Sequence, residues 1–289
     1  MKKELFDFLK ATRIERSLMP LSFIMIAVAF ANKITLSIII LMVCCILMYT
    51  VGGLINAKAD KDFKFKRAKL AIVTLLSVSI FLSFYNYIIF FTVIASLFMG
   101  FAYNKFFRFF LFGDSVALSI THVIIPILSS SLILNLNTRT FLLIIPLAAI
   151  SFGLITPMKN LRGIKEDKKR KYKTLMTSYK NGKVITHIFL SLYFIAVFLS
   201  YFLLDLGNKF LSVVFMLFII KVFMDYCMDT KKEIVAYGLV RLVIIALPFA
   251  FVFDKTTNLS LIGLSFSFIF IYFIYFVSKI KGMKEVKYV

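Results

Sequence analysis

Two polar stretches, each at the end of a long apolar run, carry the residues whose types and spacing could support chemistry. In the first, "GGLINAKADKDFKFKRAK" at 52–69, Asn56, Asp60 and Lys64 are spaced i, i+4 and i+8. A helix continued past the apolar run would place them on one face, and Asp62 adds a second carboxylate nearby. Amide and carboxylate oxygens are hard ligands of the kind that Mg²⁺ takes. The stretch therefore predicts a site for a divalent cation.

The second stretch, "TPMKNLRGIKEDKKRKYKTL" at 156–175, has a related pattern. Asn160, Gly163 and Asp167 are spaced i, i+3 and i+7, again on one helical face, and Pro157 can kink the helix end before them. If both stretches lie on one side of a membrane, their oxygens could share a cation that completes its shell with water and phosphate. The alternative is a solvated loop whose charge only sets topology. The basic side chains near these oxygens are candidates for binding phosphate: Lys64, Arg67, Arg162 and Lys165.

The composition shows which solvent surrounds these stretches. Of the 289 residues, 61% are apolar, and the mean hydropathy is +0.93, which is more apolar surface than a soluble domain can bury. The formal net charge is +21, from 35 Lys and Arg against 14 Asp and Glu, and this charge collects in short segments between apolar runs. That distribution is typical of membrane topology signals. It does not indicate nucleic-acid binding, because no interleaved aromatic and basic module is present.

Ten apolar runs are candidate membrane spans. Backbone in lipid must pair its hydrogen bonds internally, so helices are expected, and the alternating strands of a barrel are absent. The third and fourth runs form one stretch too long for a single span, and the polar "YNY" at 85–87 is the natural place for a turn. The sequence thus predicts an all-α, polytopic membrane helical bundle. Its spans are 17–31, 34–57, 70–85, 87–103, 115–134, 140–158, 184–204, 210–227, 234–253 and 259–278.

Basic residues divide unequally between the two sides of this layout. With the N-terminus inside, 29 of them fall in inner segments and 4 in outer ones, while Lys221 and Arg241 lie inside spans. The excess predicts that both termini and both polar stretches are cytoplasmic. The N-terminal segment lacks a signal-peptide cleavage pattern, so the first span is expected to be retained. The basic segment 279–288 is expected to contact anionic lipid headgroups.

Other ionisable residues in the apolar runs are interpreted structurally. Lys221, Asp225 and Arg241 are expected to form internally neutralised contacts near the cytoplasmic face. His122 and His187 are isolated in the sequence, so each is interpreted as a packed or interfacial histidine. The three cysteines lack the spacing of a metal site.

A weak internal repeat links the two polar stretches. Asn56 and Asn160 each follow a long apolar run and precede an aspartate, and they are 104 residues apart, a distance that fits four spans. We interpret residues 1–289 as a single transmembrane domain. The repeat suggests a division into two four-helix halves, about 15–110 and 111–227, followed by C-terminal helices 234–278.

Four segments in order along the chain resemble the UbiA superfamily of intramembrane prenyltransferases. The stretch "INAKADKDFKFKRAKL" resembles the first Asp-rich motif of that family, N-D-x-x-D-x-x-x-D. "MKNLRGIKEDKKRKYKTL" resembles the second motif, which contains D-x-x-x-D. "GFAYNKFFRFFLFGDSV" resembles an aromatic and basic segment followed by G-D, and "ATRIERSLMP" fits the T-R-x-x-x-S opening of the family.

The resemblance implies a fold of usually nine spans around a central cavity, here nine to ten, and a reaction in which a prenyl diphosphate alkylates a lipophilic or aromatic acceptor. It implies Mg²⁺ as the cofactor and gives Asp60 and Asp167 catalytic roles. Tyr103 and Arg108 join the candidates for binding diphosphate, although Tyr103 can also belong to the interfacial aromatic belt. The oligomeric state is not implied. The implied metal ligands are Asn56, Asp60, Asp62, Asn160 and Asp167.

The sequence departs from the family pattern where the metal ligands are expected. Ala57 and Lys64 stand at two acidic positions of the first motif, and Asn160 and Gly163 at two of the second. Tyr103 and its basic partner are also one residue further apart than usual. Three interpretations therefore stay open: an enzyme active with fewer acids, a binding or assembly protein without turnover, and an unrelated membrane transporter. A transporter would be expected to carry more ionisable residues deep in its spans.

Overall fold

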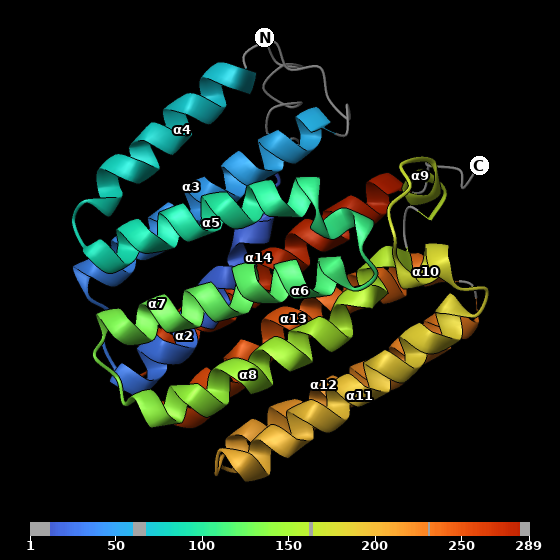
Figure 1. Ribbon diagram of the computed structural model, residues 1–289. Helices are drawn as coiled ribbons and strands as arrows, with labels where there is room; N and C mark the ends of the chain where they lie inside the picture. The colour runs from blue at the N-terminus through green and yellow to red at the C-terminus, as the bar shows by residue number, and fades with distance from the viewer. Residues whose placement is uncertain (1–11, 60–67, 162–163, 231, 284–289) are drawn as a thin grey trace.

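The computed structural model describes residues 12–59, 68–161, 164–230 and 232–283, and these form helices and connecting turns without a strand (Figure 1). The chain runs up and down through ten helical rods. Nine of them are single helices, and one is built from α6 (Gly113–Ser119), the π-helix η3 (Ile120–Ile124) and α7 (Ile125–Ile133). The nine are α2 (Leu18–Ala31), α3 (Leu36–Ala59), α4 (Ala68–Ser83), α5 (Tyr87–Lys105), α8 (Thr138–Ile155), α11 (Gly182–Leu203), α12 (Asn208–Asp229), α13 (Glu233–Lys255) and α14 (Leu259–Met283).

Each of the ten predicted spans is a helix, which confirms the predicted fold class. Eight helices of the described part of the chain are long and apolar enough to cross a membrane, and two apolar helices, Ala68–Ser83 and Leu259–Tyr275, are shorter. The predicted turn between the third and fourth spans is also confirmed. It is fixed by Asn86, whose side-chain oxygen accepts a hydrogen bond from the Ile88 N–H at 2.8 Å and so caps α5.

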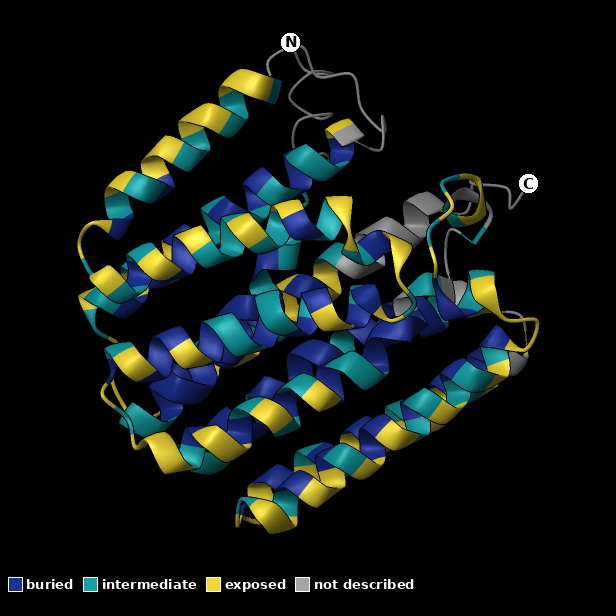
Figure 2. Ribbon diagram, in the orientation of Figure 1, coloured by how far each residue is buried: buried dark blue, intermediate teal, exposed yellow. Residues whose placement is uncertain are grey.

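The core of the bundle is formed by α2 and α13. Both are mostly buried, whereas α4, α11 and α12 present many exposed residues along their outer sides (Figure 2). Helix α2 packs against α13, α14 and α7, and α13 packs against α12. The outer exposed side chains are largely apolar, for example Phe81 and Ile219. Since lipid rather than water meets such a surface, apolar residues are expected on both sides of these helices.

Short helices connect the rods at one end of the bundle. These are η1 (Ile14–Ser17), η2 (Phe107–Phe109), η4 (Thr156–Leu161), α9 (Ile164–Lys169) and α10 (Leu175–Ser178). Helix α8 stops at Ile155 and continues as the 3-10 helix η4, as Pro157 leads one to expect. The short helices and the ends of α3 and α5 therefore gather the polar stretches at the same end of the molecule.

The structure tests the predicted helical faces of the two polar stretches to different extents. Helix α3 contains Asn56 and ends at Ala59, so Asp60, Asp62, Lys64 and Arg67 lie outside the described residues. In the second stretch, Asn160 lies in η4 and Asp167 lies in α9, and Gly163 is outside the described residues. One uninterrupted α-helix therefore does not relate Asn160 to Asp167. The predicted common face is wrong for this pair, because η4 winds with the tighter 3-10 pitch.

Candidate functional site

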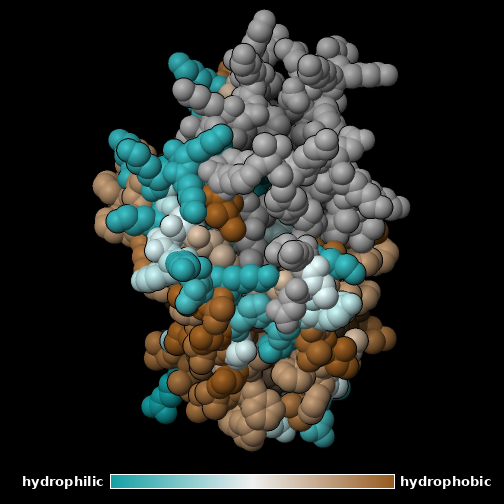
Figure 3. All heavy atoms as spheres, turned by 90° about the vertical axis from the view of Figure 1, so that its right-hand side faces the viewer, coloured by the Kyte–Doolittle hydropathy of each residue, from teal (hydrophilic) through white to brown (hydrophobic). Residues whose placement is uncertain are grey.

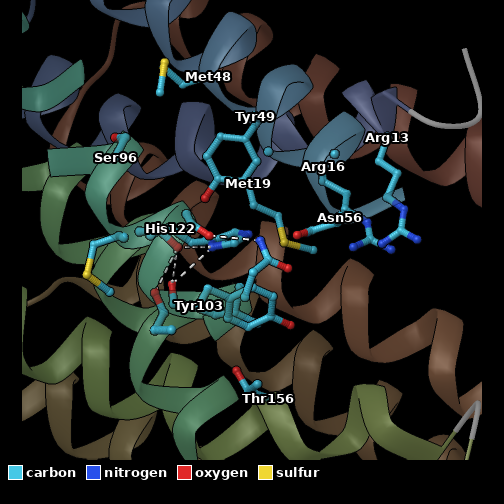
Figure 4. Close-up of a pocket in the computed structure, with 18 of the residues that line it drawn as sticks. Arg13, Arg16, Met19, Met48, Tyr49, Asn56, Ser96, Tyr103, His122 and Thr156 are labelled. Carbon is cyan, nitrogen blue, oxygen red and sulfur yellow. Dashed lines mark hydrogen bonds between the residues drawn. The ribbon is translucent and has the colours of Figure 1, made fainter. Parts of the chain in front are cut away.

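A cavity of about 190 Å³ lies at the end of the bundle where the short helices meet. Seen from that side, hydrophilic side chains gather beside hydrophobic ones (Figure 3). The inner wall is mostly apolar, and the polar side chains point into the cavity from several helices (Figure 4). The polar and charged residues of the wall are Arg13, Arg16, Tyr49, Asn56, Ser96, Tyr103, Asn104, Arg108, Thr121, His122, Thr156 and Arg241.

The formally charged side chains that line this cavity in the described residues are all positive. Four of the residues that line the cavity are arginines, and none of the lining residues that the structure describes is a carboxylate. Planar guanidinium groups in a partly enclosed site attract anions and match the oxygens of phosphate and carboxylate groups. The described wall is therefore suited to an anionic ligand with an apolar part.

Arg108 is held between two tyrosine rings. It lies in η2, immediately after α5, and is only 8% exposed. Its guanidinium carbon is 4.8 Å from the Tyr103 ring centroid and 5.1 Å from that of Tyr172, and Nη1 donates a hydrogen bond to the Tyr172 hydroxyl at 2.9 Å. Stacking and this hydrogen bond fix the plane of the guanidinium group. Tyr103 and Arg108, both predicted from the sequence, are thus brought together.

The second polar stretch is attached to this arginine. The Tyr172 N–H donates to the Asp167 carbonyl oxygen at 2.9 Å, and the Lys173 N–H donates to the Arg108 carbonyl oxygen at 3.2 Å. Asp167 and Asn160 are half-buried on segments beside the cavity but do not line it. Lys165 belongs to α9, and Arg162 lies outside the described residues. The structure therefore places the second stretch next to the cavity through Tyr172.

Asn56 is the candidate site residue of the first polar stretch that lies within the described part of the chain. It lines the cavity one turn before the end of α3, and its Oδ1 atom is buried without a hydrogen-bond partner. Asn104 on α5 has the same property at Oδ1, while its Nδ2 donates to the Gly100 carbonyl at 2.9 Å. Buried amide oxygens are almost always paired in proteins. An unpaired one in the wall of a cavity is available to a cation or to a donor group of a ligand.

His122 lines the inner part of the cavity and is only 6% exposed. It lies in the π-helix η3, and its ring is 4.9 Å from the Tyr49 ring and 5.4 Å from the Phe152 ring. Nδ1 is 3.1 Å from the Leu118 carbonyl oxygen and 3.0 Å from the Thr121 hydroxyl oxygen. The interpretation as a packed histidine is correct, but it missed that this histidine is also part of the cavity. π-Bulges are frequent at functional sites, yet no sequence pattern marks one.

Arg241 and Arg16 also line the cavity. Arg241 lies in α13, is 9% exposed, and donates through Nη1 to the Tyr272 hydroxyl at 3.1 Å and through Nη2 to the Tyr237 hydroxyl. Arg16 lies in η1 with its Nε atom buried and without a hydrogen-bond partner, and Arg241 is one of its like-charged neighbours. Sequence analysis assigned neither to a site. Arg241 was detectable as an arginine inside a predicted span.

The remaining ionisable residues of the spans lie apart from the cavity. Lys221 and Asp225 form the predicted ion pair, with Nζ 2.6 Å from Oδ2, and His187 Nδ1 is 3.0 Å from Oδ1 of the same aspartate. The internally neutralised contact is therefore confirmed for Lys221 and Asp225. It is wrong for Arg241, which donates its side-chain hydrogen bonds within the described residues to tyrosine hydroxyls instead of carboxylates. Because these residues do not line the cavity, the cavity remains the main candidate site in the described part of the chain.

Comparisons of this chain with known proteins agree with the helical fold described above. The family model of the UbiA prenyltransferase family matches residues 59–233. No curated protein matches the sequence. A structure reported for digeranylgeranylglyceryl phosphate synthase in membranes has a TM-score of 0.62 and 15% identity, covering 88% of this chain and 99% of that one.

Two archaeal structures are similar to the same extent. An apo UbiA homolog from Aeropyrum pernix K1 has a TM-score of 0.63 and 12% identity, covering 82% of this chain and 97% of that one. A UbiA homolog from Archaeoglobus fulgidus bound to Cd²⁺ has a TM-score of 0.58 and 11% identity, covering 94% of this chain and 98% of that one. At such low identities the likeness extends to the fold alone.

Proposed function

The chain belongs to the UbiA prenyltransferase family, and from this we propose that it is an integral-membrane prenyltransferase. It transfers a prenyl group from a prenyl diphosphate to a lipophilic or aromatic acceptor, with assistance from Mg²⁺, at the cytoplasmic face. The observation that carries the proposal is the arginine-lined cavity. Arg108 is held there between Tyr103 and Tyr172, and Asn56 lines the same cavity with an unpaired side-chain oxygen.

Arg108 is proposed to bind the diphosphate of the donor. Its guanidinium group is fixed by two rings, so little conformational entropy is lost when it binds phosphate oxygens. Because the charge of the leaving diphosphate increases in the transition state, a fixed cation at this place stabilises the transition state more than the ground state. Tyr103 stacks on the arginine and orients it. The other proposed diphosphate ligands are Lys64, Arg67, Arg162 and Lys165.

Asn56 fits the metal that the family implies. Its Oδ1 is a hard ligand, is buried in the cavity wall, and has no hydrogen-bond partner. The described residues contain no cluster of three His, Cys, Asp or Glu side chains that could hold an ion by themselves. A cation bound here would supply positive charge to the leaving diphosphate oxygens. The proposed ligands are Asn56, Asp60, Asp62, Asn160 and Asp167, with Asp60 and Asp167 as catalytic residues.

The apolar part of the wall is proposed to receive the reacting end of the prenyl chain. Met19, Met48 and Met99 line it, together with Phe152 and Ile244. Methionine side chains adapt to irregular apolar shapes, and the surrounding helices exclude water from the reacting carbon. In the transfer, the C1–O bond of the donor breaks and its electron pair leaves with diphosphate. A bond forms between C1 and the acceptor, whose displaced proton passes to the diphosphate.

A turnover assay with the purified full-length chain tests this function. A panel of labelled prenyl diphosphates of different lengths is incubated with candidate acceptors, with and without Mg²⁺, and diphosphate release is measured. We expect Mg²⁺-dependent release with at least one pair, and its loss in Asp60→Ala. Unchanged donor binding in Asp60→Ala would contradict the proposed site.

A second candidate function is binding without turnover. Ala57 and Lys64 stand where the family usually has acids, and exchanging an acid for lysine reverses the local charge. Prenyl diphosphate binding without diphosphate release from any donor and acceptor pair would support this alternative over the enzyme.

A further inference from the structure

We propose that residues 106–112, the aromatic loop between α5 and α6, form a lipid-binding surface whose phenylalanine rings insert into the headgroup region of the leaflet at the cavity end of the bundle. Through this contact the membrane holds Arg108, which belongs to the loop, in its place in the cavity wall. The second part rests on the proposed function, because it assigns a support to the proposed diphosphate ligand. The first part rests only on the exposure, the path and the neighbours of the loop.

The aromatic loop presents apolar rings at the polar end of the molecule. Phe106 is 55% exposed, Phe110 is 61% exposed, and Phe109 is exposed as well. Arg108, which lies among them in η2, is buried and lines the cavity. The loop therefore turns its charge inward and its rings outward, which is the reverse of the arrangement expected for a loop in water. An exposed apolar cluster of this kind marks a contact with a membrane or with another protein.

The outer face of α5 leads directly into the aromatic loop and indicates that the contact is with lipid. Four exposed apolar residues of α5 are spaced i, i+3, i+7 and i+10 and so lie along one face of the helix: Phe91, Ile94, Phe98 and Phe101. The segment Tyr87–Phe109 is long and apolar enough to cross a membrane, and such a face then meets lipid. Because this apolar segment extends to Phe109, it includes the first part of the loop.

Lys105 places the loop at the boundary between lipid and water. It is the last residue of α5, it is exposed, and its Nζ atom lies 5.0 Å from the centroid of the Phe101 ring. A lysine at the end of a lipid-facing stripe keeps its methylene stem in apolar surroundings and extends its ammonium group toward the headgroups. The phenylalanines that follow Lys105 are therefore expected at headgroup depth.

The other end of the loop joins the lipid-facing side of a second helix. The ring of Phe112 stacks on that of Phe189 in α11, with centroids 5.6 Å apart. Ile188, the residue before Phe189, and Val184, one turn earlier, are exposed apolar residues of α11. Phe112 has a φ of 63°, a left-handed conformation that is costly for a bulky side chain and that persists only where the surroundings fix it. The loop thus runs from one lipid-facing surface to another.

Basic residues beside the rings match the phosphate groups of lipid headgroups. The Lys173 N–H donates a hydrogen bond to the Arg108 carbonyl oxygen at 3.2 Å, and the Phe109 and Tyr172 rings meet edge to face with centroids 5.7 Å apart. The side chains of Lys173 and Lys105 are exposed and can bind phosphate oxygens. The same contacts connect the rings to the backbone of Arg108. A displacement of the rings would therefore move the proposed diphosphate ligand.

The location of the loop can be measured directly, because the chain contains no tryptophan. Phe110→Trp gives the full-length protein one fluorophore. The controls are Phe98→Trp in the lipid-facing stripe and Lys169→Trp at an exposed position of α9. Each variant is placed in nanodiscs of phosphatidylcholine brominated either near the headgroup or near the middle of the acyl chains. We expect bromine near the headgroup to quench Phe110→Trp most, the deeper bromine to quench Phe98→Trp most, and neither to quench Lys169→Trp strongly.

A second measurement tests whether the membrane contact supports Arg108. Phe106→Ser combined with Phe110→Ser removes both apolar rings, and we expect the affinity for pyrophosphate with Mg²⁺ to fall about threefold to tenfold, since Arg108 is then less well ordered. Phe106→Leu combined with Phe110→Leu keeps the apolar surface and should retain the wild-type affinity. Phe84→Ser is the matched control, because it removes an exposed phenylalanine in the turn between α4 and α5.

Two results would overturn the inference. One is equal bromine quenching of Phe110→Trp and Lys169→Trp, which would place the loop in water or against another protein. The other is an unchanged pyrophosphate affinity in the double serine variant, which would show that the membrane contact does not support Arg108. The proposed function fails separately. If Phe110→Trp is quenched as expected but the wild type binds neither pyrophosphate nor any prenyl diphosphate, the lipid-binding loop stands and the transferase does not.

Discussion

The guanidinium group of Arg108 donates a hydrogen bond to the hydroxyl of Tyr172 over 2.9 Å and so joins the segment after α5 to the segment after α9. The two residues are 64 positions apart in the sequence. Because Tyr172 is itself bonded to the backbone of Asp167, the proposed phosphate ligand and the second acidic stretch are mechanically coupled.

The first prediction concerns this hydrogen bond. Tyr172→Phe keeps the ring beside Arg108 but removes the hydroxyl acceptor, so the guanidinium group loses one constraint. We expect pyrophosphate affinity to fall roughly threefold to tenfold, in line with the contribution of a hydrogen bond to a charged group. Titration calorimetry measures the change. Tyr179→Phe, an exposed tyrosine of the same segment, is the control, and an equal loss there would show that the effect is unspecific.

A steric prediction follows from Gly113, the first residue of α6. A Cβ atom at this position would lie 1.9 Å from the carbonyl oxygen of Phe107, the neighbour of Arg108 in η2. Gly113→Ala must therefore shift η2, and we expect a loss of about 2 kcal/mol in stability together with weaker pyrophosphate binding. Gly263→Ala, where the Cβ meets nothing within 4 Å, should leave both quantities unchanged. A Gly113→Ala protein that melts and binds like the wild type would contradict this packing.

Asn56 should matter for metal binding and not for stability. Asn56→Leu removes a buried oxygen that has no partner, so the melting temperature should stay constant or rise, since an orphaned buried group costs roughly 1–3 kcal/mol. The concentration of Mg²⁺ needed for half-maximal pyrophosphate binding should increase about tenfold or more. Asn104→Leu is the matched control because it removes the other unpaired amide oxygen of the wall. The same Mg²⁺ shift in both variants would argue against a specific ligand role for Asn56.

Asp225 forms an ion pair with Lys221 in the same helix, α12, and contacts His187 in α11, and both contacts should be structural. Asp225→Leu leaves Lys221 and His187 without their shared carboxylate, and we expect a destabilisation of roughly 1–3 kcal/mol with unchanged turnover. Combining it with Lys221→Met should restore most of the melting temperature, because no unpaired charge remains. Thermal unfolding in nanodiscs and the prenyl transfer assay measure the two effects. Loss of turnover in the double variant would instead connect this pair with function.

The orientation in the membrane can be tested with thiol reagents. Cys44, Cys45 and Cys227 are free and buried, so background labelling should be low. We expect Lys173→Cys to react with a membrane-impermeant maleimide in inside-out vesicles and Lys209→Cys to react in right-side-out vesicles, since both positions are exposed at opposite ends of the bundle. The reverse pattern would place the proposed site on the outer face.

The sequence determined the helices well and the cavity only in part. Apolar length alone predicts all ten helices, because lipid enforces helical backbone wherever a run is long enough. It also predicts the turn at Asn86, a residue that caps a helix by a local hydrogen bond. Local patterns and family motifs likewise identified Asn56, Tyr103 and Arg108.

The residues that were missed are those whose partners are distant in sequence. Arg16 and Arg241 are 225 positions apart and meet only because η1 and α13 pack around the same cavity. Arg241 was visible as a charge inside a span, and Tyr237 is four residues before it in the same helix. Its other partner, Tyr272, cannot be inferred without the packing of α13 against α14. His122 needed the π-helix that turns it toward the cavity. None of these contacts can be predicted from a periodic pattern in the sequence.

The packing of α2 against α13 and α14 has a consequence for biosynthesis. Helix α2 leaves the ribosome before α13 and α14 but buries its face against them, and Thr256, after α13, donates a hydrogen bond to Asn32 at the end of α2. A nascent chain halted before α13 therefore holds α2 in the bilayer with a large unmatched face. Arg16 cannot meet Arg241 in such an intermediate, so the complete pocket is assembled only near the end of translation. The insertion machinery or a chaperone would have to shelter α2 during that interval.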